Sequence, residues 1–146
     1  MNVETQMDAA KSLRTHKVKG LINFKDFSNL LKGIYNSADF DPNLHSLWDV
    51  RDADFSAVTP PEIRALAEYV RANWDMKRKN KAAIVVSGLS DFGISRMYEQ
   101  ILGPAATGKV MVFRNIKTAW DWIEGKPATA GHKAVGPKVP DSNPPN

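Results

Sequence analysis

The stretch KAAIVVS at residues 81–87 decides the fold, together with KVMVF at residues 109–113. Inside both runs the residues are apolar without an alternating polar position, which is typical of strands buried on both faces of a sheet. The order strand, helix, strand predicts a parallel crossover, because Gly103 and Pro104 end a helical segment between the two runs. One face of that helix is apolar, at Ile94, Met97, Tyr98, Ile101 and Leu102.

Further elements extend this crossover toward both ends of the chain. Residues 44–50 form a predicted strand, and the polar stretch 13–19 is a weaker one that we expect near an edge of the sheet. Three more helices are predicted, each behind a capping residue: Asn23, Thr59 or Asn115. We therefore expect an α/β fold, with an open, mostly parallel sheet of four to five strands and four helices.

The composition divides the chain and excludes several kinds of site. The chain has 146 residues, a net charge of +4 and no cysteine, so disulfides and thiolate chemistry are excluded. Five of the nine prolines and no aromatic residue fall in residues 125–146, which predicts a disordered basic tail. Residues 13–124 are the predicted domain, and residues 1–12 are an added strand or a loose segment. Since no signal or membrane-spanning segment is evident, we expect a soluble cytoplasmic protein.

Several fragments of the predicted domain together carry a family resemblance. They are Gly20 with Asn23–Phe27, Leu47–Ala53, Thr59–Ile63, Ala83–Ser87, Gly93 with Arg96–Tyr98, Val112–Arg114, and Ala119 with Trp122 and Ile123. In order and spacing they resemble the STAS superfamily of anti-sigma factor antagonists, and most of all its uncharacterised SpoIIAA-like (STAS/SEC14-like) branch. The resemblance implies that fold and allows the binding of small apolar or lipid-like ligands. Antagonists carry an Asp-Ser-Ser-Gly-like phosphoacceptor, whereas residues 52–59 read DADFSAVT, so no phosphorylation switch is implied.

Polar residues that follow the predicted strands form a candidate binding surface. In open α/β sheets, ligands bind outside the carboxyl ends of the strands, beside helix N-termini that present free backbone amides. Arginines there can recognise a carboxylate or phosphate. Trp122 lies off the apolar stripe of its helix. With Phe92, Met97, Tyr98 and Met111 it is a candidate to line a pocket or a subunit contact, and the alternative is that these large side chains only pack at the end of the sheet. The predicted binding residues are Asp49, Arg51, Asp52, Ser87, Ser90, Asp91, Phe92, Arg96, Arg114 and Trp122.

The same residue types also have a purely structural interpretation. Ser90 is then the N-cap of its helix, and Arg51 and Arg114 pair with acidic neighbours at positions 49, 52 or 54. Helix starts and loop ion pairs use these residue types without binding any ligand.

A small hydrolase or phosphotransfer enzyme using Ser90 or Asp49 is an alternative function. The turn that exposes a hydrolase serine requires glycine where Phe92 stands, and the only downstream histidine is His132. A phosphoacceptor role for Asp49 lacks the acidic pair and the lysine that receiver domains use, and the carboxylates at 49, 52 and 54 are a weak candidate for magnesium.

The basic run KRKNK at residues 77–81 suggests a third function, a weak electrostatic adaptor for nucleic acid or an anionic membrane. Because it has no interleaved aromatic residues and follows a predicted helix, whose dipole favours cations there, nucleic-acid binding is not expected. We predict a non-enzymatic binding or regulatory module, without metal or cofactor, that recognises a protein partner or a small apolar or anionic ligand. A homodimer is compatible with this prediction.

Overall fold

The computed structural model describes residues 1–73, 80–103 and 109–126, apart from the side chains of residues 89–92. Within these residues the chain forms five strands, four α-helices and one short 3₁₀-helix. The strands are β1 (Asn2–Asp8), β2 (Leu13–Leu21), β3 (His45–Asp54), β4 (Ala82–Val85) and β5 (Val110–Phe113). The helices are η1 (Ala9–Lys11), α1 (Phe24–Tyr35), α2 (Pro60–Asn73), α3 (Leu89–Leu102) and α4 (Ile116–Glu124).

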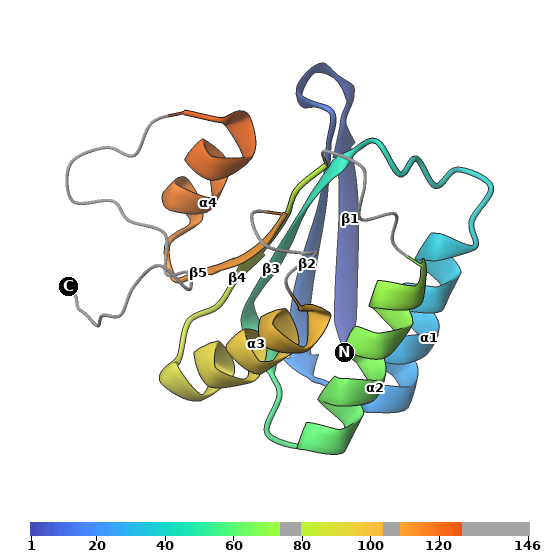
Figure 1. Ribbon diagram of the computed structural model, residues 1–146, viewed down its shortest axis with the longest axis vertical. Helices are drawn as coiled ribbons and strands as arrows, with labels where there is room; N and C mark the ends of the chain where they lie inside the picture. Colours follow the sequence, from blue (N-terminus) through green and yellow to red (C-terminus); the bar gives the residue numbers. More distant parts are fainter. Residues whose placement is uncertain (74–79, 104–108, 127–146) are drawn as a thin grey trace.

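The five strands form one sheet in the order β1-β2-β3-β4-β5 (Figure 1). The pairs β2–β3, β3–β4 and β4–β5 are parallel, and β1 is antiparallel to β2. The prediction of an open, mostly parallel α/β sheet with four helices is confirmed. Part of the segment 1–12, for which the sequence left a strand or a loose segment open, is the edge strand β1.

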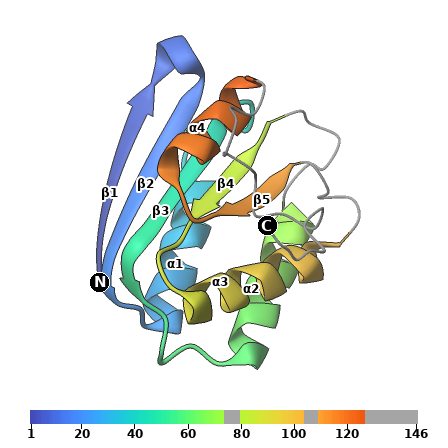
Figure 2. The same cartoon turned by 90° about the vertical axis from the view of Figure 1, so that its left-hand side faces the viewer.

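The helices divide between the two faces of the sheet, with α1, α2 and α3 on one face and α4 on the other (Figure 2). Successive residues of a strand point to opposite faces, so each strand contributes to both layers. Toward α4 point Leu13, Leu47, Ala83, Val85, Met111 and Phe113. Toward α1, α2 and α3 point Val18, Trp48, Val50, Ile84, Val110 and Val112.

Three helix starts have the predicted caps. The Asn23 side chain accepts a hydrogen bond from Asp26 N at 3.1 Å, and Asn115 accepts one from Thr118 N, also at 3.1 Å. At α2 the capping box closes in both directions. The backbone N of Thr59 donates to Glu62 Oε1 at 2.9 Å, and Glu62 N donates to Thr59 Oγ1 at 3.4 Å.

The start of α3 differs from the prediction that Ser90 caps this helix. The N-cap is Gly88, which makes no side-chain capping bond, and Leu89 is the first helical residue. Ser90 therefore lies inside the first turn. Glycine is tolerated at this place, where the backbone is extended at φ −110°.

Strand β3 is longer than predicted, and this moves two candidate residues from a loop into the sheet. The sequence predicts that this strand ends at Val50. In the structure β3 continues to Asp54, because β2 pairs with it as far as Leu21. Arg51 and Asp52 are therefore strand residues. The pairing shifts by one residue between Lys17 and Lys19, an irregularity that a sequence pattern does not reveal.

Helix α4 ends at Gly125, whose φ of +74° lies in the left-handed region that favours glycine. The Gly125 backbone N–H reaches the carbonyls of Asp121 and Trp122. Most of the predicted tail 125–146 lies outside the described residues. Among the helices that the structure describes, none combines the length and the apolar character needed to cross a bilayer.

Candidate functional site

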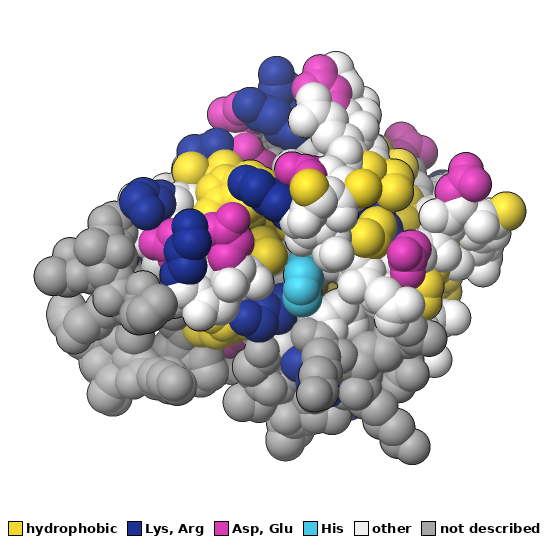
Figure 3. All heavy atoms as spheres, turned by 90° about the horizontal axis from the view of Figure 1, so that it is seen from above, with side chains coloured by type: hydrophobic (Ala, Val, Ile, Leu, Met, Phe, Trp, Pro, Cys, Tyr) yellow, Lys and Arg dark blue, Asp and Glu magenta, His cyan; other side chains and the backbone are white. Residues whose placement is uncertain are grey.

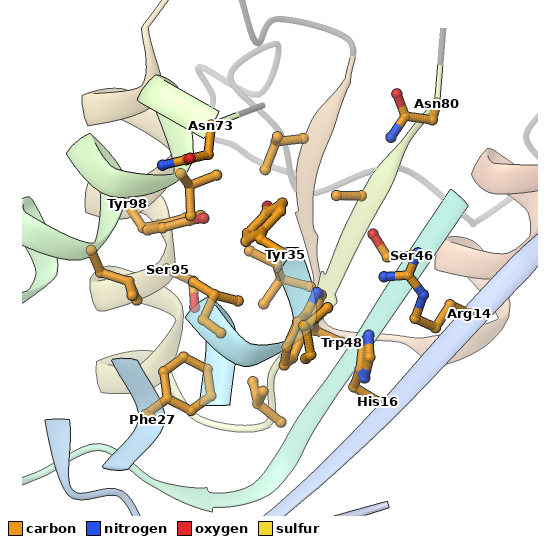
Figure 4. Close-up of a pocket in the computed structure, with 18 of the residues that line it drawn as sticks. Arg14, His16, Phe27, Tyr35, Ser46, Trp48, Asn73, Asn80, Ser95 and Tyr98 are labelled. Atoms are coloured by element: carbon orange, nitrogen blue, oxygen red, sulfur yellow. The ribbon is translucent and has the colours of Figure 1, made fainter. Parts of the chain in front are cut away.

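A cavity of about 350 Å³ lies between the sheet and the layer formed by α1, α2 and α3 (Figure 4). This volume is at the lower end of the ~300–1,000 Å³ range of small-molecule sites. Most of the wall is apolar and aromatic, and it includes Phe27, Leu31, Trp48, Leu66, Ile84 and Ile94. The cavity therefore fits a small ligand with a large apolar part.

Two polar side chains of β2 reach this cavity because strand residues alternate between faces. Leu13 points toward α4, so Arg14 and His16 point toward the cavity. The register places Arg14 opposite Ser46 and His16 opposite Trp48. Figure 4 shows these four side chains together on β2 and β3, with Ser95 and Tyr98 of α3 across from them. The cavity thus has a polar region on its β2 side.

Arg14 is a buried cation with few partners among the described residues. Arg14 is only 8% exposed. Its Nη2 donates a hydrogen bond to the backbone carbonyl of Asp41 at 3.0 Å. The guanidinium lies over the ring of Phe40, 4.7 Å from the centroid. No carboxylate among the described residues forms an ion pair with it. Burial lowers the pKa of Arg14, partly opposed by Tyr35 and Asp41, but a guanidinium stays protonated.

His16 is a buried neutral imidazole. It is 1% exposed and stacks on Trp48, with 4.1 Å between the ring centroids. Its Nδ1 lies 2.9 Å from Thr5 Oγ1 in β1, while no described residue partners its buried Nε2. Burial, together with the nearby Arg14 cation, lowers the pKa of His16 to about 4. The ring therefore adds a polar atom to the cavity without adding charge at neutral pH.

Two tyrosines place hydroxyl groups on the helix side of the cavity. Burial, reinforced by Tyr69, raises the pKa of Tyr35 to about 12. Burial also raises the pKa of Tyr98, with Tyr35 adding to the effect. Both phenols therefore stay protonated and neutral, and they can hydrogen-bond a ligand without carrying charge.

The predicted residues at the end of β3 are joined to one another. Arg51 donates to Asp49 through two parallel bonds of 2.8 Å, from Nε to Oδ1 and from Nη2 to Oδ2. These side-chain bonds are the main reason that the pKa of Asp49 is lowered. Ser87 Oγ donates to the Arg51 carbonyl at 2.9 Å. The structural interpretation, in which Arg51 pairs with an acidic neighbour, is confirmed for this residue.

The other predicted site residues are dispersed. Asp52 and Arg114 are exposed, and Arg96 Nε lies 3.4 Å from Glu99 Oε1 on α3. The side chains of Ser90, Asp91 and Phe92 lie outside the described residues. None of the seven predicted residues whose side chains the structure describes is among those that line the cavity.

The predicted grouping of Trp122 with Tyr98 is wrong, because the sheet separates them. Trp122 packs with Met111 and Phe113 on the α4 face, with its ring centroid 5.5 Å from that of Phe113. Tyr98 lines the cavity on the opposite face. Spacing along a helix does not show which face of the sheet the helix covers.

Sequence reasoning missed Arg14 and His16. Residues 13–19 were predicted as a weak, polar strand near an edge, and the alternation within them was not used. Arg14, His16 and Val18 share one face of that strand, and β1 covers its outer edge, so the face is buried. A charged residue and a histidine two positions apart in a predicted strand are the signal that identifies them.

The charges are mixed on the face of the molecule that Figure 3 shows. Seen from above, basic side chains alternate with acidic ones around small apolar areas (Figure 3). Of the basic run 77–81, only Asn80 and Lys81 are described; Lys81 Nζ donates to the Trp122 carbonyl at 2.7 Å and lies 5.3 Å from its ring centroid. Within the described ranges, no three His, Cys, Asp or Glu side chains gather in a way that could hold a metal ion.

Comparisons with known proteins bear on the fold. No model of a known protein family matches the sequence, and no curated protein matches it. The chain is similar in structure to an uncharacterised protein from Shewanella loihica PV-4, described as a DUF3478 family protein with a SpoIIAA-like fold. The TM-score is 0.52 at 16% sequence identity, and the match covers 84% of this chain and 92% of that one. The resemblance found in the sequence is thus confirmed at the level of architecture, and the chain has a SpoIIAA-like α/β fold.

Proposed function

We propose that the protein is a non-enzymatic binding module that holds a small, mainly apolar ligand in the cavity between the sheet and α1, α2 and α3. The cavity itself is the observation that carries this proposal. Protein interiors are close-packed, with few voids larger than a water molecule. A pocket of about 350 Å³ between the sheet and three helices has the size of a small-molecule site, and we take it as the site of the ligand.

The polar lining favours binding over catalysis. It offers a guanidinium, a neutral imidazole, hydroxyls and amides, from Arg14, His16, Ser46, Tyr35 and Asn73 among others. Of the described residues that line the cavity, none is Asp, Glu or Lys, the residue types that most often accompany histidine as acids and bases. The guanidinium, imidazole, hydroxyl and amide groups of the lining can orient a ligand by hydrogen bonds, and the apolar wall supplies the larger part of the affinity.

Fluorescence titration with the neutral dye N-phenylnaphthylamine tests the proposal on the full chain. We expect saturable, one-to-one binding, since the dye is apolar and small enough for the site. Ile84→Phe adds a larger side chain to the sheet side of the cavity and is expected to weaken dye binding at least about tenfold. Leu21→Phe makes a similar change at an exposed position, 58% accessible, and is expected to leave binding unchanged.

Native mass spectrometry of the purified chain, followed by solvent extraction, supplies the second measurement. We expect a bound small molecule whose retention is lost in Ile84→Phe and kept in Leu21→Phe. Failure of the folded wild type both to bind the dye and to retain any molecule would overturn the proposed function.

A further inference from the structure

The polar region of the cavity is built from two buried side chains that stand side by side. Arg14 and His16 are two positions apart on β2, which separates their Cα atoms by roughly 6–7 Å. Both line the cavity, and Figure 4 shows their side chains next to each other beside Ser46 and Trp48. A ligand at this end of the cavity therefore lies beside both residues.

Among the described residues, Arg14 has no carboxylate ion-pair partner of the kind that a buried cation requires. A charge removed from water is costly unless an opposite charge and hydrogen bonds compensate for it. A guanidinium has five N–H donors, yet Arg14 makes one described hydrogen bond, to a backbone carbonyl, and no described ion pair. The ring of Phe40 compensates only in part. Asp41 acts on the Arg14 charge at longer range, so the described residues compensate this positive charge only in part.

His16 adds an unpartnered polar atom at the same place. When the Thr5 hydroxyl donates to Nδ1 across their 2.9 Å separation, Nε2 carries the ring proton. That N–H is buried and has no partner among the described residues, and it belongs to a residue that lines the cavity. The site then presents a cation and a neutral hydrogen-bond donor together. The two oxygens of a carboxylate can accept hydrogen bonds from both.

We infer that the ligand is an amphiphilic monocarboxylate whose carboxylate binds between the Arg14 guanidinium and the His16 Nε2–H, with its apolar part along Leu66, Ile84 and Ile94. This inference rests on the proposed function and adds the chemical class of the ligand. One guanidinium matches one negative charge, whereas a phosphate monoester at neutral pH brings a second charge that no described cation of the lining neutralises. The apolar wall matches a short acyl chain or a ring.

Calorimetric titration of the wild type at pH 7 with three ligands of one chain length tests the inference. Decanoate carries one charge, decanamide is its neutral analogue, and decyl phosphate carries the larger charge. We expect decanoate to bind about 10- to 100-fold more tightly than decanamide, the range for charge-assisted hydrogen bonds. We also expect decanoate to bind more tightly than decyl phosphate.

Two variants identify the residues responsible. Arg14→Gln is expected to reduce decanoate affinity about 10- to 100-fold and to change decanamide affinity less than about threefold. His16→Phe keeps the ring stacked on Trp48 but removes Nε2–H, so a loss of about tenfold for decanoate is expected. The control is Arg114→Gln, since Arg114 is exposed and outside the cavity lining. Binding of N-phenylnaphthylamine verifies that each variant keeps its cavity.

The outcomes separate this inference from the proposed function. If the dye binds while decanoate and decanamide bind equally to the wild type, the carboxylate assignment is wrong and the apolar site remains. Tighter binding of decyl phosphate than of decanoate would also overturn it. If neither the dye nor any of the three ligands binds, both proposals fail.

Discussion

The two faces of the sheet differ in how completely their helices fill them. On the α4 face, Leu47, Ala83, Val85 and Phe113 are fully buried under a helix of nine residues. On the opposite face, neighbouring residues of the same strands border a cavity of about 350 Å³ that contains a buried cation. The same strands therefore border a packed core on one face of the sheet and a cavity on the other. The two faces differ in the helices that cover them.

The helices explain the difference through what they pack against. Helix α4 contacts the sheet directly, through Ala119 and Ile123. Helices α2 and α3 pack on each other as well, around Val70 and Leu102, so part of their apolar surface is used between helices. We infer that the packed face stabilises the fold and that the hollow face binds the ligand.

The largest expected effect is on the packed face. Phe113→Ala removes a fully buried ring and is expected to lower the free energy of unfolding by about 3–5 kcal/mol. Leu66→Ala, at the cavity wall, is expected to cost only about 1–2 kcal/mol because the leucine is partly buried. Urea denaturation measures the free energy of unfolding of both variants. Equal decreases in the two variants would contradict the difference between the faces.

The next effect is a pH dependence that belongs to the hollow face. The folded pKa of His16 is about 4, below its ordinary 6.5, so between these values only the unfolded chain takes up the proton. Stability is therefore expected to fall as the pH drops from 6.5 to 4, by about 3 kcal/mol from this group. Arg14 beside the ring opposes its protonation, while Thr5, Ser46 and Trp48 supply no charge.

His16→Phe is expected to remove this contribution from the pH profile of the unfolding free energy. His45→Phe is the comparison variant, because His45 is a second histidine whose pKa burial lowers. Its Nδ1 accepts a hydrogen bond from Lys81 N, and it lies outside the residues that line the cavity. A profile that is parallel in the wild type and His16→Phe would show that His16 is not buried in its neutral form.

Adding volume at neighbouring positions of β4 sharpens the comparison. Val85→Phe forces a ring into the packed face and is expected to destabilise the fold by about 1–3 kcal/mol. Ile84→Phe makes the same kind of change toward the cavity and is expected to cost less than about 1 kcal/mol. Thermal and urea unfolding compare the two, and a greater cost at Ile84 would mean that the cavity cannot accept the ring.

The smallest effect concerns the ion pair at the end of β3. Asp49→Asn weakens the paired bonds to Arg51 and is expected to cost about 1 kcal/mol, since Arg51 is partly exposed to water. Asp52→Asn, at an exposed position, is expected to change stability by less than about 0.5 kcal/mol. If Asp49→Asn has no effect on urea unfolding, the pair does not hold this part of the strand.

The local features of the fold could be predicted because each depends on nearby residues. The capping box of Thr59 and Glu62 and the apolar runs around Ile84 and Val112 are of this kind. The end of β3 could not be predicted, because its length depends on pairing with β2, which is distant in the sequence. The N-cap of α3 was not predicted either, because Ser90 has the better capping side chain whereas the helix begins behind Gly88.

The cavity was beyond sequence reasoning for a different reason. Periodicity shows that Ile84 and Leu66 face inward, but it does not show whether the space between them is filled. The polar residues that follow the strands predicted a binding surface that includes Asp49 and Arg51, but these two side chains bind each other. Arg14 and His16 lie in the middle of a strand, where burial by β1 and the helices gives them their significance.

The tryptophan indole N–H signals in a ¹H–¹⁵N NMR titration with decanoate test the central claim most directly. Trp48 lines the cavity, whereas Trp120 and Trp122 pack on the α4 face, so each face carries its own reporter. Assignment follows from single Trp→Phe variants. We predict a saturable shift of the Trp48 signal while those of Trp120 and Trp122 stay in place. A shift confined to Trp120 and Trp122, or none in any of the three, would contradict the assignment of the ligand to the hollow face.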